Sequence, residues 1–342
     1  MAGPYSARKI TATIERIKRP VNFLWNIMIG KEIEEVVQEI EIHSKDNGRV
    51  RAAFVGPMSN GILIEREGFA VERYKPPFIT LKIPASAESA YQQQFGEGIY
   101  VTGKKDLNKI IKKQVADDLK TLKSITHRTK IWALSKLLIS GIYPMGDGKE
   151  GIKYGDFALK VLTGSDKFDA EDSDISGWLS QQKLEVQKNT GNVVDTVIVT
   201  PDVARCIINN KVLMEKIKVL NSTLIDLNPK EKEPGVSYIG YIPEIDTKIY
   251  SYMDWAKEHG KTTEEPILPA GTLLYFKAKS FRVNYGSFPF REKLTDKSKI
   301  FVGKEAVKTV PSSEGNTDLL ELKSSPLIIP EDAQGWVAAK VI

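Results

Sequence analysis

The most regular hydrophobic pattern in this sequence lies between Lys104 and Gly141. Apolar residues recur there mostly every three or four positions, which is the spacing of one face of an α-helix. These apolar positions are Leu107, Ile110, Ile111, Val115, Leu119, Leu122, Ile125, Trp132, Ala133, Leu137 and Leu138. The stretch from 104 to 140 has no proline or glycine, and Gly141 followed by Pro144 ends the pattern. We therefore predict one helix over 104–141.

A helix of that length is long for a chain of this size. At 1.5 Å per residue it would span roughly 57 Å. A compact chain of 342 residues has a radius of gyration of only about 20 Å. Two interpretations remain open at this point: a long buried helix inside an ordinary globular protein, or a structural spine that carries the other parts of the chain.

Residues 31–83 alternate between apolar and polar positions and therefore predict β-structure. Val36–Ile42 is predicted as a strand, and Asn47-Gly48 is a hairpin signal with Val50–Val55 as the return strand. Further strands are predicted at Ile62–Glu65, Ala70–Tyr74 and Phe78–Ile83. The segment 56–77 is charged and has few apolar residues for a core of its own. Because a long two-stranded excursion is marginal alone, we expect it to need a partner surface.

The second half of the chain mixes strand and helix patterns. A helix is predicted at Ile175–Gln187, behind the acidic stretch Asp166–Asp174, and another at Pro201–Asn209, with Thr200 as its N-cap. The other predicted elements are a helix near Val212–Val219 and strands at Val193–Val199, Tyr238–Ile242, Lys248–Met253, Leu273–Lys277, Phe281–Tyr285, Leu319–Ser324 and Trp336–Val341. Loops are predicted at 228–235 and 256–266. This order is consistent with a second α/β or α+β domain.

Composition changes this picture little. The chain is 41% hydrophobic and 27% charged, which is ordinary for a soluble globular protein, and its length suggests roughly two domains. The single cysteine, Cys206, excludes an internal disulfide framework and fits a reducing compartment. A net charge of +5 is too small to indicate nucleic-acid binding by itself.

Residues 1–30 are predicted to form a basic arm. Its apolar patch contains Phe23, Leu24 and Trp25, the candidate arm-contact residues, and could pack on the chain's own body or on a neighbour. The apolar run Val21–Ile29 is too short to span a bilayer, and no cleavage motif follows it. We therefore expect a soluble, non-secreted protein.

No catalytic or metal-binding pattern stands out in the sequence. No two of the three histidines, His43, His127 and His259, lie at metal-ligand spacing. The segment 146–151, GDGKEG, matches a dinucleotide-binding pattern, but it follows a predicted helix and precedes a strand, which is the reverse of the required order. We therefore predict a turn at 146–151 and no catalytic residue, cofactor or metal.

The polar face of the predicted long helix is basic. Ten basic residues stand against three acidic ones between 104 and 141. Candidates for a DNA-facing group are Lys112, Lys113, Lys120 and Lys123. A solvated helix face explains such a run in most proteins, but a surface that faces a dense polyanion would also be basic. Both interpretations remain open.

Six short motifs occur along nearly the whole chain. They are Phe23-Leu24, Ala52–Gly61 (AAFVGPMSNG), Tyr74–Pro77 (YKPP), Val197–Pro201, Leu268–Thr272 (LPAGT) and Ser325–Ile329 (SPLII). In their order and spacing they resemble the tailed-phage major capsid proteins, specifically the lambda-type capsid protein E family.

This resemblance implies a non-enzymatic α+β protein with the Hong Kong 97-type capsid fold. The expected parts are an N-terminal arm (1–45), an extended β loop (46–83), a peripheral domain (84–185) with the spine helix 104–141, an axial domain (186–305), and C-terminal strands (306–342) that complete the peripheral and axial sheets. The extended loop would lie on an adjacent subunit. Its expected contact residues are Ile62, Leu63, Ile64, Arg66, Glu67, Phe69, Arg73 and Tyr74.

The resemblance also implies the function of a phage major capsid protein. Hexamers and pentamers would form an icosahedral head around double-stranded DNA, with the protein assembled in the host cytoplasm and found in the virion. The expected partners are further copies of the chain, a scaffold protein, a portal, often a decoration protein, and the packaged DNA, but no membrane. One alternative is a nanocompartment shell of the same fold around a protein cargo. Another is a soluble enzyme with an unrecognised site.

Overall fold

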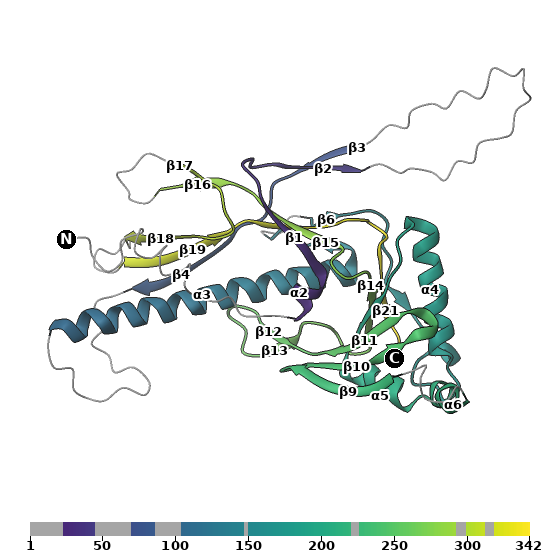
Figure 1. Ribbon diagram of the computed structural model, residues 1–342. Helices are drawn as coiled ribbons and strands as arrows, with labels where there is room; N and C mark the ends of the chain where they lie inside the picture. Colours follow the sequence, from purple (N-terminus) through teal and green to yellow (C-terminus); the bar gives the residue numbers. More distant parts are fainter. Residues whose placement is uncertain are drawn as a thin grey trace, which may run out of the picture.

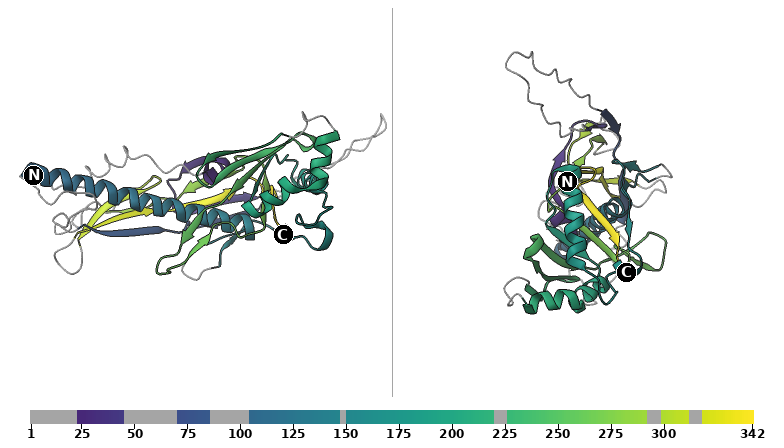
Figure 2. Two further views of the ribbon diagram at one scale, coloured as in Figure 1. Left: turned by 90° about the horizontal axis from the view of Figure 1, so that it is seen from below. Right: turned by 90° about the vertical axis from the view of Figure 1, so that its right-hand side faces the viewer.

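The protein, seen in a computed structural model, is an elongated body with one long helix running along it (Figures 1 and 2). The structure describes residues 23–44, 70–85, 104–146, 150–219, 226–291, 299–311 and 318–342. Within these ranges, helices and sheets are mixed along the chain, as expected for an α+β protein.

The long helix is α3, Lys104–Ser140, and it has 37 residues. It ends one residue before the predicted boundary, because Gly141 takes a left-handed φ of 70° and its N–H donates to the Leu137 carbonyl at 2.8 Å. Two positions assigned to its apolar face are wrong, since Ile125 and Trp132 are 42% and 39% exposed. These two lie seven residues apart and therefore share one side of the helix, which is turned away from the core.

A three-stranded antiparallel sheet packs along the N-terminal half of α3. Its order is β18–β19–β4, with β18 at Ala306–Pro311, β19 at Asp318–Ser324 and β4 at Ile79–Ala85. The core between helix and sheet consists of Val115, Leu119, Leu122, Val307, Leu320 and Leu322. Alternation along β19 sends Leu320 and Leu322 towards the helix and leaves Glu321 on the other face, paired with Lys82 and Lys308.

The C-terminal half of α3 packs in a larger core beneath a second three-stranded sheet. Helix α2, Phe23–Met28, leads into β1, Ile29–Glu34, which pairs in parallel with β15, Phe281–Tyr285. Strand β20, Pro326–Pro330, pairs antiparallel with the other edge of β15. The core side chains of this region include Leu24, Met28, Ile131, Leu134, Leu137, Leu138, Phe281, Val283, Leu327 and Ile328.

The third and largest sheet has seven strands in the order β7–β21–β14–β8–β11–β10–β9. Their bounds are β7 Lys160–Val161, β8 Thr196–Val199, β9 Asp226–Glu233, β10 Val236–Ile242, β11 Thr247–Tyr252, β14 Thr272–Phe276 and β21 Trp336–Lys340. The helices of this region are α4 Ile175–Thr190, α5 Pro201–Asn209 and α6 Lys211–Val219. Along β8, Ile198 belongs to the core that contains α3, whereas Val197 and Val199 belong to the core under α4 and α5. The sheet is therefore buried on both faces.

The segment after residue 305 supplies strands to all three sheets. Strands β18 and β19 join the sheet on the N-terminal half of α3, β20 joins β15, and β21 lies between β7 and β14 in the large sheet. The strands near the end of the sequence therefore connect the separate hydrophobic cores.

Short two-stranded ribbons complete the described structure. They are β2 Ile40–Ser44 with β3 Ala70–Tyr74, β5 Ile142–Tyr143 with β6 Ile152–Lys153, β12 Trp255–Lys257 with β13 Glu264–Pro266, and β16 Phe288–Phe290 with β17 Lys299–Phe301. The predicted hairpin at Asn47-Gly48 and the predicted strand at Val50–Val55 lie outside the described residues.

The structure corrects three predictions of local structure. The predicted strand Val36–Ile42 is formed only from Ile40, because the Val36 and Val37 carbonyls accept bonds from the side chain and backbone of Ser287. The predicted loop 228–235 is largely strand β9, and its Pro229 is tolerated because β9 is an edge strand that needs no donor on its open side. The predicted loop 256–266 contains the paired strands β12 and β13.

Gly141 provides a test of how α3 is terminated. A Cβ at this position would lie 2.5 Å from the Phe157 Cβ, in addition to the strain of a left-handed φ. Gly146 has nearly the same φ, 72°, but a Cβ there would meet nothing within 4 Å. We expect Gly146→Ala to cost about 1–2 kcal/mol from backbone strain alone, and Gly141→Ala to cost about 1–3 kcal/mol more from the clash.

Chemical unfolding of the two variants beside the unchanged protein measures this difference in the free energy of unfolding. Equal losses at the two positions would show that Phe157 does not constrain the end of α3.

Candidate assembly surfaces

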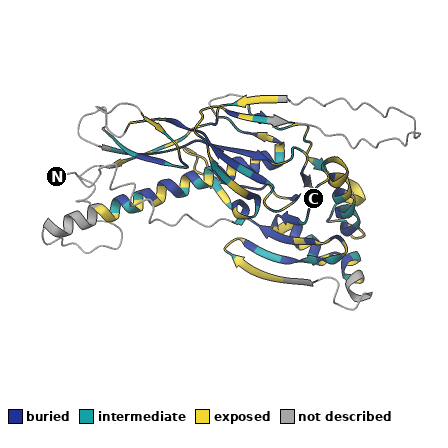
Figure 3. Ribbon diagram, turned by 45° about the horizontal axis from the view of Figure 1, so that its top comes forward, coloured by how far each residue is buried: buried dark blue, intermediate teal, exposed yellow. Residues whose placement is uncertain are grey.

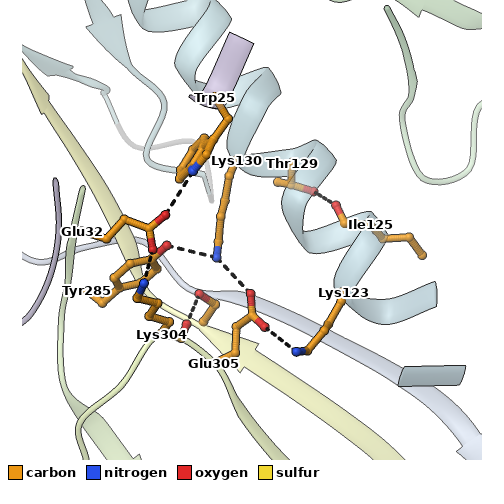
Figure 4. A network of polar contacts seen from close by, with 10 residues as sticks. Trp25, Glu32, Lys123, Ile125, Thr129, Lys130, Tyr285, Lys304 and Glu305 are labelled. Carbon is orange, nitrogen blue, oxygen red and sulfur yellow. Dashed lines mark hydrogen bonds and ion pairs between the residues drawn. The ribbon is translucent and has the colours of Figure 1, made fainter. Parts of the chain in front are cut away.

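Two lysines on α3 are buried and share one carboxylate (Figure 4). The side chains of Lys123 and Lys130 are 5% and 2% exposed, and that of Glu305 is 6% exposed. The Nζ of Lys130 lies 3.2 Å from Glu305 Oε1, and the Nζ of Lys123 lies 3.8 Å from Oε2. An uncompensated charge at such a depth costs several kcal/mol, so the pairing fixes α3 against the connection between β17 and β18.

The same network continues to the start of the described chain. Lys130 Nζ donates to Tyr285 Oη at 3.4 Å and lies 4.9 Å from the centre of that ring. Glu32 of β1 accepts a 3.1 Å bond from Trp25 Nε1 and forms an ion pair with Lys304. Figure 4 shows these side chains converging from α2, β1, β15, α3 and the 302–305 connection. The network therefore joins the arm region to the helix.

The arm residues singled out from the sequence pack on their own chain. Leu24 and Trp25 are buried, and Phe23 is half-buried with its ring centre 5.0 Å from that of Tyr250. Of the two arrangements left open by the sequence, the fold of the single chain contains the first, with the patch on its own body.

The β2–β3 ribbon lies within and next to the segment 46–83 that is predicted to be the extended loop. Arg73 pairs with Glu41 across it at 2.8 Å, and the Tyr74 hydroxyl donates to Glu72. Burial, reinforced by Glu72, raises the pKa of Tyr74 to about 12, so this hydroxyl stays a donor at neutral pH. The other loop-contact residues predicted from the sequence, Ile62, Leu63, Ile64, Arg66, Glu67 and Phe69, lie outside the described residues.

The basic candidates on α3 divide into two groups. Lys112, Lys113 and Lys120 are exposed. Lys123 is not, so placing it on the solvent face is wrong. It lies one turn after Leu119, on the packed side of the helix, and its charge is met by Glu305. Sequence could not reveal this, because Glu305 is 182 positions further along the chain.

Neither a metal site nor a membrane helix is evident in the described part of the chain. Across the seven described ranges, no three His, Cys, Asp or Glu side chains are grouped to hold a metal ion. None of the helices within those ranges is long and apolar enough to cross a membrane. The described residues form a framework of helix α3 and three sheets, which shared strands and buried ion pairs connect, and parts of its surface are exposed.

Comparison with known protein families identifies the family of this chain. The family described as "Phage major capsid protein E" matches residues 6–341. The chain belongs to this capsid protein family. Among curated proteins, none matches the sequence significantly.

Solved structures agree with this capsid assignment at the level of the fold. A prophage protein of E. coli CFT073, described as its capsid protein, matches with a TM-score of 0.68 and 14% identity over 98% of this chain and 99% of that one. A phage-related protein from Bordetella bronchiseptica RB50 matches with a TM-score of 0.52 and 9% identity over 99% and 98%. The capsid protein thus has the α+β, Hong Kong 97-type fold.

Membership of the capsid protein family indicates a role for the exposed faces of the subunit. A major capsid protein is a structural subunit of the virion shell, so it associates with other copies of itself. The exposed faces of the subunit are therefore candidate contacts in an assembly.

The capsid protein should depend strongly on Glu305. We expect Glu305→Gln to cost about 3–5 kcal/mol of unfolding free energy, because it leaves Lys123 and Lys130 buried without their carboxylate. Lys130→Met should cost less, because Lys123 still faces Glu305. Denaturant titration followed by circular dichroism measures both losses.

Asp156→Asn is the matched control, since Asp156 pairs with Lys153 but its side chain is 96% exposed. It should cause no measurable change. A Glu305→Gln variant as stable as Asp156→Asn would show that the buried network does not hold the fold.

Proposed function

We propose that this capsid protein forms the hexamers and pentamers of an icosahedral phage head that encloses double-stranded DNA. The family match over residues 6–341 carries the proposal. The elongated shape of the subunit supports the proposal. One helix runs along the body, which three sheets hold together, and its long sides are available for contact with neighbouring subunits (Figure 2). Assembly would take place in the host cytoplasm with a scaffold protein, a portal and, in the finished head, a decoration protein.

Each part of the fold would occupy a different position in the hexamer or pentamer. Residues 186–305 contain the strands from β8 to β17 and would form the axial domain at the centre of each hexamer or pentamer. The region of residues 84–185, with α3, would form the peripheral domain. The extended loop at 46–83 would leave its own subunit through the β2–β3 ribbon and lie on the next one.

A nanocompartment of the same fold is the second candidate. The particle contents separate the two functions, since a phage head holds nuclease-protected DNA and a nanocompartment holds a protein.

Assembly of the purified protein tests the proposal and the role of the extended loop together. Negative-stain microscopy and sedimentation should show closed shells. Replacing residues 56–77 with a short Gly-Ser linker should leave a folded subunit that forms no shells, because the surface over the neighbour is gone.

Circular dichroism and thermal melting check that the deletion variant is folded. Normal shells from this variant would contradict the role of the loop. A compact monomer under all conditions, with or without scaffold protein, would contradict the shell function itself.

The exposed lysines Lys112, Lys113 and Lys120 are proposed to face packaged DNA. Changing all three to Gln should leave shells intact and reduce the DNA that they retain. Each lost phosphate contact lowers the slope of log affinity against log salt by about 0.9, so retention should also become less sensitive to salt. Nuclease-protected DNA per particle, measured over a salt series, gives both effects.

The matched control removes three exposed lysines elsewhere: Lys153, Lys188 and Lys340 to Gln. An equal loss of DNA in both triple variants would mean that net charge, rather than this helix face, sets retention. Unchanged retention in the α3 variant would leave these lysines as a solvated face.

A further inference from the structure

The C-terminal half of α3 carries an exposed stripe that its own chain does not cover. Ile125 and Trp132 are 42% and 39% exposed on one side of the helix, with Arg128 between them and Lys136 one turn further on. The Nζ of Lys136 lies 5.8 Å from the centre of the Trp132 ring. Around this stripe the helix is buried, as the following positions show: Ile131, Ala133, Leu134, Ser135, Leu137 and Leu138. We name Ile125, Arg128, Trp132 and Lys136 the α3 stripe.

Along the α3 stripe two apolar side chains alternate with two basic ones, and it has no acidic residue. Between Leu119 and Ser140 the sequence has no aspartate or glutamate. The two buried lysines in that interval are matched by Glu305, but Arg128 and Lys136 are exposed. A large aromatic side chain surrounded by charge of one sign is typical of a protein–protein contact.

A second surface of the same chain has the complementary character. The β12–β13 hairpin, Trp255–Pro266, is exposed at every residue from 257 to 266, and Trp255 at its base is 45% exposed. Trp255 pairs in register with Pro266, which makes an apolar patch at the root of the hairpin. In Figure 1 this hairpin stands apart from the stacked strands of the large sheet.

The charge of this hairpin is opposite to that of the α3 stripe. From 254 to 266 it carries four acidic residues, Asp254, Glu258, Glu264 and Glu265, against the two lysines Lys257 and Lys261. Lys261 already pairs with Glu258 at 2.7 Å and Glu265 at 3.7 Å. The hairpin therefore has an exposed tryptophan beside an excess of acidic residues. The α3 stripe has an exposed tryptophan beside an excess of basic residues.

We propose that the β12–β13 hairpin of one subunit docks on the α3 stripe of the next subunit in the shell. The proposal rests on self-assembly as described under the proposed function. The two surfaces are different parts of the same chain, so the contact is heterologous, and repeating it around an axis closes a ring. Each subunit then uses its hairpin on one side and its stripe on the other. Lys112, Lys113 and Lys120 lie N-terminal to the stripe and take no part in this contact.

Charge reversal with rescue tests this contact. Arg128→Glu with Lys136→Glu should lower the yield of shells at least tenfold, and so should Glu264→Lys with Glu265→Lys. Combining all four changes in one chain should restore most of the yield, because the two reversed surfaces again attract. Sedimentation measures the yield, and thermal melting confirms that each variant is folded.

The matched control is Leu184→Ala on α4, where the side chain is 62% exposed but belongs to neither surface. It should assemble normally. Two impaired double variants without rescue in the combined chain would overturn the pairing, as would double variants that assemble as well as the control.

Disulfide trapping tests the same contact without relying on charge. In a Cys206→Ser background, Ile125→Cys and Trp255→Cys are placed in one chain, and assembled particles are oxidised. A ladder of linked subunits longer than dimers is expected on a non-reducing gel, and each single-cysteine variant should stay monomeric. Particles that give only monomers, or a product that stops at dimers, would overturn the heterologous contact.

These outcomes are separable from failure of the proposed function. If the unchanged protein forms shells but the trapped variant gives no ladder, the shell function stands and this contact is wrong. If the unchanged protein forms no particle with or without scaffold protein, both the shell function and the contact that depends on it are wrong.

Discussion

The fold of this capsid protein depends on a carboxylate that two buried lysines share. Glu305 lies in the connection between β17 and β18, yet it forms ion pairs with both Lys123 and Lys130, which are two turns apart on α3. The apolar face of α3 already constrains how the helix packs, because rotating it would expose buried side chains and disrupt close packing. Two lysines that must both meet one carboxylate restrict the helix further. The ion pairs therefore add a directional constraint to the apolar packing of the helix, and the rotation of the helix decides which residues reach the surface.

The consequences spread through the parts that α3 touches. Its N-terminal half packs under the β18–β19–β4 sheet, and its C-terminal half lies in the core shared by α2, the β15 sheet and one face of the large sheet. Figure 3 shows buried and exposed residues alternating along the helix where it leaves the main body. A rotated helix would bury the stripe at Trp132 and would expose Lys130 without a partner. Assembly surfaces far apart on the molecule are therefore set by one local electrostatic arrangement.

The sequence predicts the framework well where a local pattern determines it. Helix α3 is predicted to within one residue, because its periodicity is long and Gly141 marks its end. Helix α5 is predicted without error from a Thr-Pro start and an apolar face. The capsid family is also correctly predicted, since its short motifs occur in order over the chain.

The rest depends on contacts between residues far apart in sequence. Sequence places Lys123 on the solvent face, because no residue near it in the chain indicates Glu305. It places Ile125 and Trp132 in the core, because apolar spacing cannot distinguish a face packed within the subunit from an exposed one. Pro229 suggested a loop, since only the strand order shows that β9 is an edge. The extended-loop residues from Ile62 to Phe69 stay predictions.

The position of strand β21 also affects the order in which the large sheet can form during synthesis. It lies between β7 and β14 in the large sheet, although β14 is complete more than sixty positions earlier in the chain. On the ribosome, β14 therefore waits with one edge open until residue 340 has emerged. A polypeptide released early has an unpaired strand edge and an unfinished core, which makes it a substrate for chaperones and proteases. A subunit with both edges of β14 paired therefore forms only after β21 has been inserted between β7 and β14.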